Sequence, residues 1–193
     1  MPRTKLKQAV ACQVYTPLLV ERTKDHHPDQ VWAVDITYIR MRRGFMYLFI
    51  IIDLYSRYIV DYQLSTTLDR QFVLDCLKRA FMKGKPEIIN SDQGGQFTNI
   101  GYVKLLKSEK IRISMNGKGP ALDNIFVERF FRALKYEDIY LNEYVTPKDL
   151  RKGLQRYINY YNACINPWAT PRRLVITRPC RLPKKHVRKG GQH

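Results

Sequence analysis

The chain has 193 residues, and 34 Lys and Arg against 17 Asp and Glu give it a formal net charge of 34 − 17 = +17. This balance excludes an acidic protein, and a hydrophobic content of 45% excludes a chain that is disordered throughout. The longest apolar run, residues 45–52, has eight residues, whereas crossing a bilayer takes roughly 20. We therefore expect a cytoplasmic protein, and the four cysteines, which show no paired spacing, are expected to be reduced thiols.

The first predicted elements are three strands. From residue 31 to 39 the side chains alternate, so that Trp32 and Val34 share one face while Asp35 and Thr37 lie on the other. Residues 41–44 predict a turn, after which residues 45–52 and 58–63 predict two further strands of a meander. The pattern thus places a carboxylate, that of Asp35, on one face of the first strand.

A helix is predicted next, with Thr67 or Asp69 as its N-terminal cap and Gly84 as its end. Its apolar stripe consists of Phe72, Val73, Cys76, Leu77, Ala80 and Phe81. A short strand after Pro86 leads to Asp92, which lies in a glycine turn. A helix over residues 98–107 and a strand over residues 111–114 follow.

Two helices complete the pattern. Residues 115–121 predict a loop, and residues 122–140 predict a helix that carries Glu128. The segment from Thr146 to Asp149 is a capping box with Pro147 at the first helical position, and it begins the last helix. Because strands come first and then mix with helices, we expect an α/β fold with a mixed sheet flanked by helices.

The positive charge is concentrated at the two ends. Residues 1–24 carry five basic residues and one acidic residue, and residues 172–193 carry eight basic residues and no acidic one. We interpret residues 1–24 and 166–193 as basic tails around a core of residues 25–165. Cationic tails bind polyanions by releasing counterions, so nucleic acid is the predicted partner. On charge alone, solvated tails without a partner are the alternative.

Three carboxylates are candidates for a shared site. Asp35 lies within a strand, Asp92 just after one, and Glu128 in a helix, with 128 − 92 − 1 = 35 residues between the last two. Each alone is typical of an ordinary surface or turn residue. Gathered at one sheet edge, they would raise one another's pKa unless cations neutralised them. Oxygen ligands of this kind select Mg²⁺ or Mn²⁺.

Several ordered motifs carry a resemblance to a known family. They are residues 32–39 (WAVDITYI), 52–57 (IDLYSR), 91–94 (SDQG), 114–115 (SM), 123–124 (DN) and 128–135 (ERFFRALK). These motifs resemble the integrase catalytic core of bacterial insertion-sequence transposases, and the resemblance spans about residues 17–162. It implies a ribonuclease H-like fold related to retroviral integrases. It also implies a DDE triad formed by Asp35, Asp92 and Glu128, with two Mg²⁺ or Mn²⁺ ions.

The same resemblance implies a function and partners. The expected activity is that of a DDE-type transposase, a metal-dependent enzyme that cleaves and joins DNA strands during transposition. The expected partners are the element ends, the target DNA and further copies of the chain. Arg132 and Lys135 follow Glu128 by four and seven residues, near the same helix face, and are candidate DNA contacts together with Lys118. An ordinary basic helix face is the alternative for the first two. Asn124 either supports the site or caps the helix.

Other residues also suggest roles in a site. Asp53 competes as a metal ligand, but we favour a structural role in which it pairs with Arg57 or caps the turn that follows the second strand. His26 and His27 suggest zinc, yet no cysteine pair at finger spacing accompanies them. Trp32 is interpreted as an anchor of the sheet rather than a platform for a base.

Two departures from the family pattern keep alternative functions open. The 24 residues before the core are too few for a helix-turn-helix domain, and residues 163–171 lack the basic residue and histidine that relatives carry before a Thr-Pro pair. One alternative is a shortened, catalytically impaired transposase that acts as a DNA-binding regulator. Another is a core whose end recognition comes from a separate chain. A ribonuclease H-type nuclease acting on RNA–DNA hybrids is the third.

Overall fold

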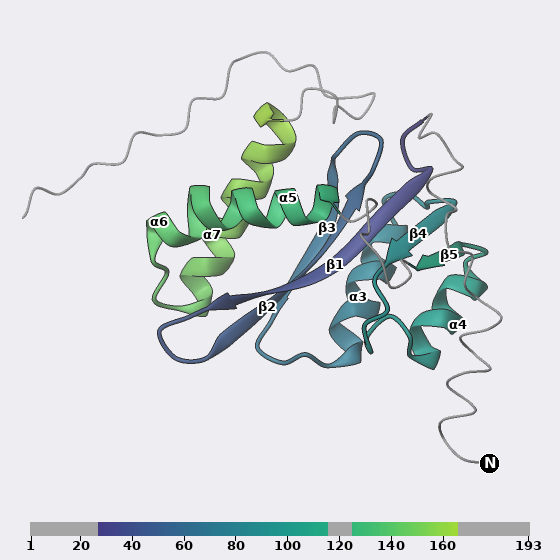
Figure 1. Ribbon diagram of the computed structural model, residues 1–193, viewed down its shortest axis with the longest axis horizontal. Helices are drawn as coiled ribbons and strands as arrows, with labels where there is room; N and C mark the ends of the chain where they lie inside the picture. The colour runs from purple at the N-terminus through teal and green to yellow at the C-terminus, as the bar shows by residue number, and fades with distance from the viewer. Residues whose placement is uncertain (1–26, 116–124, 166–193) are drawn as a thin grey trace, which may run out of the picture.

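The computed structural model of the chain describes residues 27–115 and 125–165 (Figure 1). The strands are β1 (Val31–Arg40), β2 (Phe45–Asp53), β3 (Ile59–Ser65), β4 (Ile88–Ser91) and β5 (Arg112–Met115). The helical segments are α3 (Arg70–Phe81), α4 (Ile100–Ser108), α5 (Ile125–Leu134), the π-helical turn η2 (Lys135–Ile139), α6 (Tyr140–Asn142), α7 (Pro147–Tyr160) and the π-helical turn η3 (Tyr161–Ile165). Both predicted tails, and the positions of His26, Lys118 and Asn124, lie outside the described residues.

The five strands form one mixed sheet in the order β3-β2-β1-β4-β5. β1, β2 and β3 are an antiparallel meander, whereas β4 runs parallel to both β1 and β5. Each parallel pairing is reached through a helix, α3 before β4 and α4 before β5, as parallel strands require. The prediction of a mixed sheet flanked by helices is confirmed.

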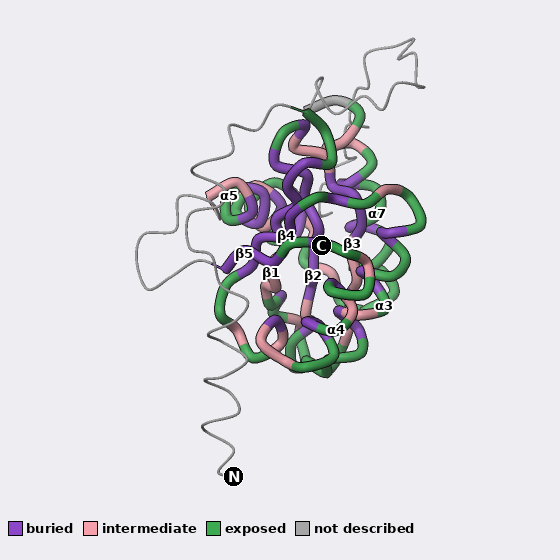
Figure 2. The backbone as a smooth tube through the Cα atoms, turned by 90° about the vertical axis from the view of Figure 1, so that its right-hand side faces the viewer, coloured by how far each residue is buried: buried purple, intermediate pink, exposed green. Residues whose placement is uncertain are grey.

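The alternation predicted for β1 separates two hydrophobic cores. Trp32 and Val34 belong to the core that includes α3 and α4, whereas Val31 and Ala33 belong to the core that includes α5 and α7. The two pairs of helices lie on opposite sides of the sheet (Figure 1), and the strands between them are largely buried (Figure 2). Because successive side chains alternate, Asp35 faces the side of α5.

Local sequence signals set the ends of the first elements. The turn after β1 closes with the N–H of Met41 donating to the carbonyl of Gly44 at 3.0 Å, and Gly44 has a φ of +79°, which glycine adopts without steric cost. α3 begins after Asp69, whose side chain accepts from the N–H of Phe72. Of the two caps predicted for this helix, Asp69 is therefore the one used. The six residues predicted to form its apolar stripe are all buried.

Smaller expectations have mixed outcomes. α4 begins two residues later than predicted, because the side chain of Asn99 caps it by accepting from the N–H of Tyr102. Cys76 is a free, buried thiol, and the other three cysteine side chains lie outside the described part of the chain. Among the described residues, the helices are too short or too polar to cross a bilayer.

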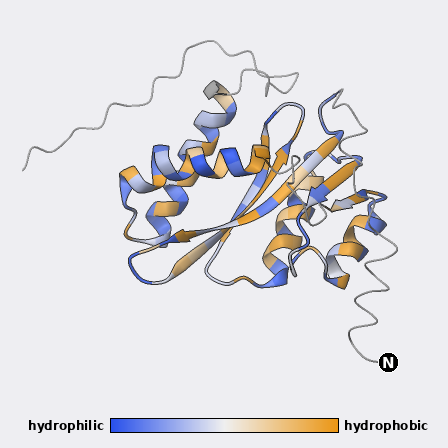
Figure 3. Ribbon diagram, viewed as in Figure 1, coloured by the Kyte–Doolittle hydropathy of each residue, from blue (hydrophilic) through white to orange (hydrophobic). Residues whose placement is uncertain are grey.

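The helix expected over residues 122–140 is interrupted. Hydrophobic and hydrophilic residues alternate along α5 (Figure 3), but α5 ends at Leu134 and the chain then passes through η2 into α6. The π-helical turn directs Asp138 inward, where it accepts from Asn142 Nδ2 at 2.9 Å and Tyr144 Oη at 2.8 Å. These bonds compensate for burying the carboxylate. The prediction of one continuous α-helix is wrong here, because apolar spacing does not reveal a single wide turn.

α7 begins with the predicted capping box. Thr146 Oγ1 accepts from the N–H of Asp149 at 3.2 Å and donates to its Oδ2 at 2.6 Å, and Pro147 is the first helical residue. Just beyond the helix, the Asn162 side chain binds the backbone N–H and C=O of Ile59 at 2.9 and 3.0 Å. These two bonds fix the end of α7 to β3.

Gly153 allows the ring of Tyr144 to lie against α7. A Cβ built at Gly153 would overlap the hydroxyl end of Tyr144, which donates to Asp138 and accepts from Arg156. We predict that Gly153→Ala lowers the free energy of unfolding by about 1–3 kcal/mol, the usual cost of overpacking. A decrease in the free energy of unfolding would be diagnostic, because replacing Gly by Ala within a helix otherwise raises it by about 1 kcal/mol. Urea denaturation measures the change.

A Tyr144→Ala background supplies the control for this prediction. Without the ring, Gly153→Ala is expected to stabilise the protein, since only the helix propensity remains. An equal loss of stability in both backgrounds would show that contact with Tyr144 is not the cause.

Candidate active site

The pairing of β1 with β4 brings the first two acids together. Residues 31–33 pair with residues 88–90 in parallel, at a constant offset of 88 − 31 = 57. Extending this offset two residues beyond the last observed pair would set Asp35 beside Asp92, since 35 + 57 = 92. Residues opposite each other in a parallel pair point to the same face of the sheet. Asp35 is half-buried within β1, and Asp92 is exposed immediately after β4.

Glu128 approaches the same place from α5. This helix buries its other face in the core beneath β1, through Val127, Phe130, Phe131 and Leu134. Glu128 is left exposed in the first turn of the helix. The charges of Asp92 and Glu128 both raise the pKa of Asp35, so both carboxylates lie within electrostatic range of it.

Burial is the main cause that raises the pKa of Asp35 to about 6, and the charges of Asp92 and Glu128 add to the rise. The N–H of Ile36, which donates to Asp35 Oδ1 at 2.7 Å, opposes it. Carboxylates in such a setting gain stability in their charged forms from a nearby cation, and an all-oxygen donor set suits Mg²⁺ or Mn²⁺.

The orientation of the three acids is not that of a closed metal cage. Within residues 27–115 and 125–165, no group of three Asp, Glu, His or Cys side chains is arranged to hold a metal ion. Asp35 and Asp92 each turn one oxygen to a backbone N–H, those of Ile36 and Gly94. The all-oxygen donor chemistry of the acids suits a divalent cation, but the side chains as placed do not form a site for one.

Asp92 is held in a tight turn that depends on glycine. Its Oδ1 accepts from the N–H of Gly94 at 2.8 Å, the arrangement of an Asx turn. A Cβ at Gly94 would lie 2.8 Å from this same oxygen, whereas a Cβ at Gly95 would meet nothing within 4 Å. The sequence predicted a turn here. That Gly94 also sets the position of the carboxylate emerges only from the structure.

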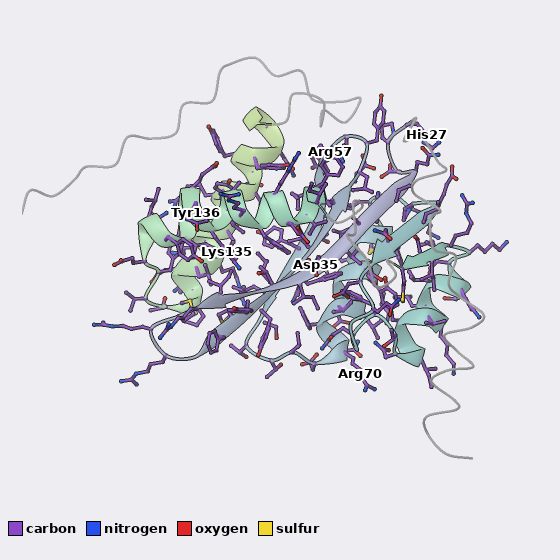
Figure 4. All side chains as sticks on the ribbon, viewed as in Figure 1. His27, Asp35, Arg57, Arg70, Lys135 and Tyr136 are labelled. Carbon is purple, nitrogen blue, oxygen red and sulfur yellow. The ribbon has the colours of Figure 1, made fainter. Side chains whose placement is uncertain are left out.

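The two described cations predicted to contact DNA follow Glu128 along the helix. Lys135 Nζ donates to Thr37 Oγ1 at 2.8 Å and lies 5.3 Å from the centre of the Tyr38 ring, and desolvation lowers its pKa. Arg132 is exposed. Figure 4 shows Asp35 on β1, with Lys135 further along the α5 and η2 ribbon. Because Asp35 and Thr37 share a face of β1, Lys135 lies beside the same face as the acids.

The remaining candidate site residues, Asp53, Trp32 and His27, make contacts that are structural. Asp53 is 2% exposed and accepts from the N–H and Oγ of Ser56 and from the N–H of Asp29, so it caps the turn after β2 as expected. Burial nevertheless raises its pKa. Trp32 is fully buried, which confirms it as an anchor of the sheet. His27 Nε2 lies 3.4 Å from a Glu87 oxygen, and no zinc-like cluster includes it in the described part of the chain.

Two features near the acids escaped the sequence analysis. The guanidinium of Arg57, considered only as a partner for Asp53, lies 3.1 Å from the centre of the Phe126 ring, at the start of the helix that carries Glu128. Asn90 is fully buried two residues before Asp92, on the same face, and its amide atoms have no hydrogen-bond partner among the described residues. An amide directly after two isoleucines in a short strand was the one available signal for Asn90.

Solved structures with this architecture are catalytic cores of viral integrases. The HTLV-2 integrase catalytic core domain in complex with magnesium aligns with a TM-score of 0.58 and 17% identity, over 72% of this chain and 90% of that chain. An intasome of simian T-cell lymphotropic virus in complex with a PP2A regulatory subunit aligns with a TM-score of 0.63 and 18% identity, over 82% of this chain and 61% of that chain. The class defined by the fold is therefore the ribonuclease H-like class of the integrase cores.

Sequence comparison makes the assignment more specific. Two family descriptions, both named Integrase core domain, match residues 25–120 and 109–164. Transposase InsF for insertion sequence IS3A of Escherichia coli (strain K12) is 35% identical over 144 residues, which cover 73% of this chain and 49% of the relative. Putative transposase InsK for insertion sequence element IS150 of the same strain is 36% identical over 143 residues, 72% of this chain and 50% of the relative. The chain belongs to the integrase core domain family, and it spans about half the length of these curated relatives.

The structural role of Asp53 is testable. We predict that Asp53→Ala lowers the free energy of unfolding by about 2–3 kcal/mol, because buried donors lose a charged acceptor. Asp53→Asn, which keeps one acceptor oxygen, is expected to lose less. Urea denaturation in metal-free buffer measures both. Unchanged stability of Asp53→Ala would contradict the structural assignment.

Proposed function

We propose that this chain is the catalytic core of a DDE-type DNA transposase, which cleaves DNA strands and joins them to a target. The single observation that carries the proposal is that Asp92 and Glu128, which come from two other parts of an integrase-like fold, both lie within electrostatic range of Asp35. The similarity to insertion-sequence transposases adds support from sequence. The acids come from β1, from the turn after β4, and from α5, so tertiary structure is needed to assemble them.

The three carboxylates are the residues that would hold two Mg²⁺ or Mn²⁺ ions. Such ions, when bound, supply Lewis-acid stabilisation to the attacking and leaving oxygens of an in-line displacement at phosphorus. The solved HTLV-2 integrase core contains magnesium. In this chain the rigid sheet supports Asp35, the glycine turn supports Asp92, and the packed helix supports Glu128, so each donor has its own element to fix it.

The proposed reaction is a phosphoryl transfer without a covalent protein intermediate. The oxygen of a water molecule or a DNA 3′-hydroxyl forms a bond to phosphorus, and the bond from phosphorus to the leaving 3′-oxygen breaks. The nucleophile loses its proton and the leaving oxygen gains one. Positioning and charge stabilisation dominate such reactions. We assign the holding of DNA phosphates to Lys135 and Arg132, and to Lys118.

The assembly that performs the reaction is also a proposal. Transposition joins two element ends to one target, so we expect several copies of the chain to act together on DNA. A separate chain or segment would supply recognition of the element ends. The basic segments 1–24 and 166–193 would add affinity for DNA that is independent of sequence and falls steeply with salt.

Strand transfer tests the triad. The substrate is a pre-cleaved duplex with the terminal sequence of the element, incubated with a plasmid target and Mn²⁺. Asp35→Asn, Asp92→Asn and Glu128→Gln are each expected to lower the rate of joining by more than about 10³-fold, as loss of a catalytic group does. Gel analysis of joined products provides the measurement, and circular dichroism should show an unchanged fold.

Asp75→Asn is the matched control, because Asp75 is an exposed carboxylate on α3, on the far side of the sheet. Its rate should equal that of the wild type. Near wild-type joining by any triad variant would remove that residue from the site. If the wild-type chain bound DNA but joined none, it would be a regulator instead, and cleavage confined to RNA–DNA hybrids would indicate a nuclease.

The two adjacent glycines offer a finer test of position. Gly94→Ala forces the Asp92 carboxylate to move, whereas Gly95→Ala does not. We expect Gly94→Ala to slow joining by about 10²-fold, the scale of an ångström-sized misplacement, and to raise the Mn²⁺ concentration needed for half-maximal rate. Gly95→Ala should leave both quantities unchanged. Equal effects of the two substitutions would refute the positioning role of Gly94.

A further inference from the structure

A pocket lies on the α5 side of the sheet, away from the acids. Its volume is ≈ 650 Å³, and it is enclosed by the β1–β2 turn, by the end of η2 with α6, and by the segment that leads into α7. The end of β1 contributes Arg40, the turn contributes Arg42, α6 contributes Tyr140, and the following segment contributes Glu143 and Tyr144.

The chemistry of this pocket combines cations with an exposed aromatic surface. Arg40 and Arg42 are exposed, and no ion pair in the described part of the chain involves them. Tyr140 is 55% exposed, and its ring meets that of Tyr136, which is 64% exposed, edge to face at 5.4 Å. The guanidinium of Arg132 lies 6.0 Å from the Tyr136 ring. An aromatic face beside unpaired cations is the combination that binds single-stranded nucleic acid.

The pocket connects to the acids along two elements. On β1, the five steps from Asp35 to Arg40 cover about 17 Å at 3.3 Å per residue. Through α5 and η2, the twelve steps from Glu128 to Tyr140 cover about 18 Å at 1.5 Å per residue. The contact between Lys135 and Thr37 joins the two elements partway. Stacked nucleotides rise about 3.4 Å each, so about five nucleotides span this distance.

We propose that this pocket binds an unpaired nucleotide of the DNA strand held at the carboxylates, about five nucleotides from the reacting phosphate. The base lies against Tyr140, and Arg40 and Arg42 hold its phosphate. This inference rests on the proposed function. It adds a site at which the base pairs near the DNA end are opened. Stacking on tyrosine tolerates any base, so the pocket selects unpaired DNA rather than a sequence.

Charge favours DNA over a second copy of the chain as the occupant. Arginines without ion pairs attract phosphate, and a protein partner would need acidic groups to match them. The chain offers few, since it has 17 acidic against 34 basic residues. Glu143 is the acidic residue of the lining, which also contains Arg40 and Arg42.

Fluorescence anisotropy with the full chain tests the proposal. The probes are two labelled duplexes of equal length, one fully paired and one with its last six base pairs mismatched, at one fixed salt concentration. Tyr140→Leu is expected to weaken binding of the frayed duplex by about 5- to 150-fold, the equivalent of losing one stacked base. Binding of the paired duplex should stay within about twofold. Tyr140→Phe, which keeps the ring, should bind both duplexes as the wild type does.

The Arg42→Ala variant provides a second, independent test of the pocket. It should weaken binding of the frayed duplex and reduce the slope of log affinity against log salt by about 1, as loss of one phosphate contact does. Melting temperatures within error of the wild type would show that the exposed substitutions leave the fold intact.

The remaining outcomes overturn the inference. If the wild-type chain bound both duplexes equally and Tyr140→Leu changed neither, the pocket would have no role in fraying, although the proposed function would stand. If Tyr140→Leu altered the sedimentation of the protein rather than its DNA affinity, the surface would be a protein interface. Failure of the wild type to bind either duplex would defeat the proposed function as well.

Discussion

The short parallel pairing between β1 and β4 is the constraint on which the rest of the structure depends. Three residue pairs, from Val31 with Ile88 to Ala33 with Asn90, set the register. A slip by one residue would turn Asp92 to the opposite face of the sheet from Asp35. Ile88 lies in one hydrophobic core and Ile89 in the other, so β4 is packed on both faces beside β1. This pairing sets where the chain carries Asp92 relative to Asp35.

The third acid depends on a different kind of contact. α5 reaches the sheet through its buried aromatic and aliphatic side, and its first turn is covered by the Arg57 guanidinium over Phe126. η2 then redirects the chain so that Asp138 is buried and hydrogen-bonded. The acidic site and the basic, aromatic surface beyond it therefore belong to one continuous helical segment with a single π-helical irregularity. Through η2, the helical segment continues from the acids to the basic, aromatic surface, while the side of the segment that is buried changes.

Periodicity and turn chemistry predicted most of the fold. The alternation around Asp35, the stripe of α3 and the capping box at Thr146 all depend on near neighbours in the chain, and such local signals are readable from sequence. The α5–η2 boundary and the clearance at Gly153 were not predicted, because they depend on partners such as Tyr144 that no local pattern specifies.

The candidate triad shows the same division. Its members were singled out by residue type, spacing and resemblance, whereas the relation of Asp35 to Asp92 depends on a strand register, and that of Glu128 on the packing of α5, which no local pattern specifies. The contact of Gly94 with the Asp92 side chain, and the burial of Asn90, are also tertiary features. The sequence thus identified the chemical groups, and the structure supplied their neighbours.

The unequal lengths of β1 and β4 have a further consequence. β1 continues to Arg40, but in the described part of the chain β4 pairs only with its first three residues. Among the described residues, no strand pairs with the later backbone groups of β1 on that side, and unpaired edges in other proteins invite sheet-to-sheet aggregation. Lys135 lies beside this part of β1, through its contact with Thr37, and the following turn carries arginines. Because like charges oppose the pairing of two edges, the cations that we assign to phosphate binding would also disfavour such association.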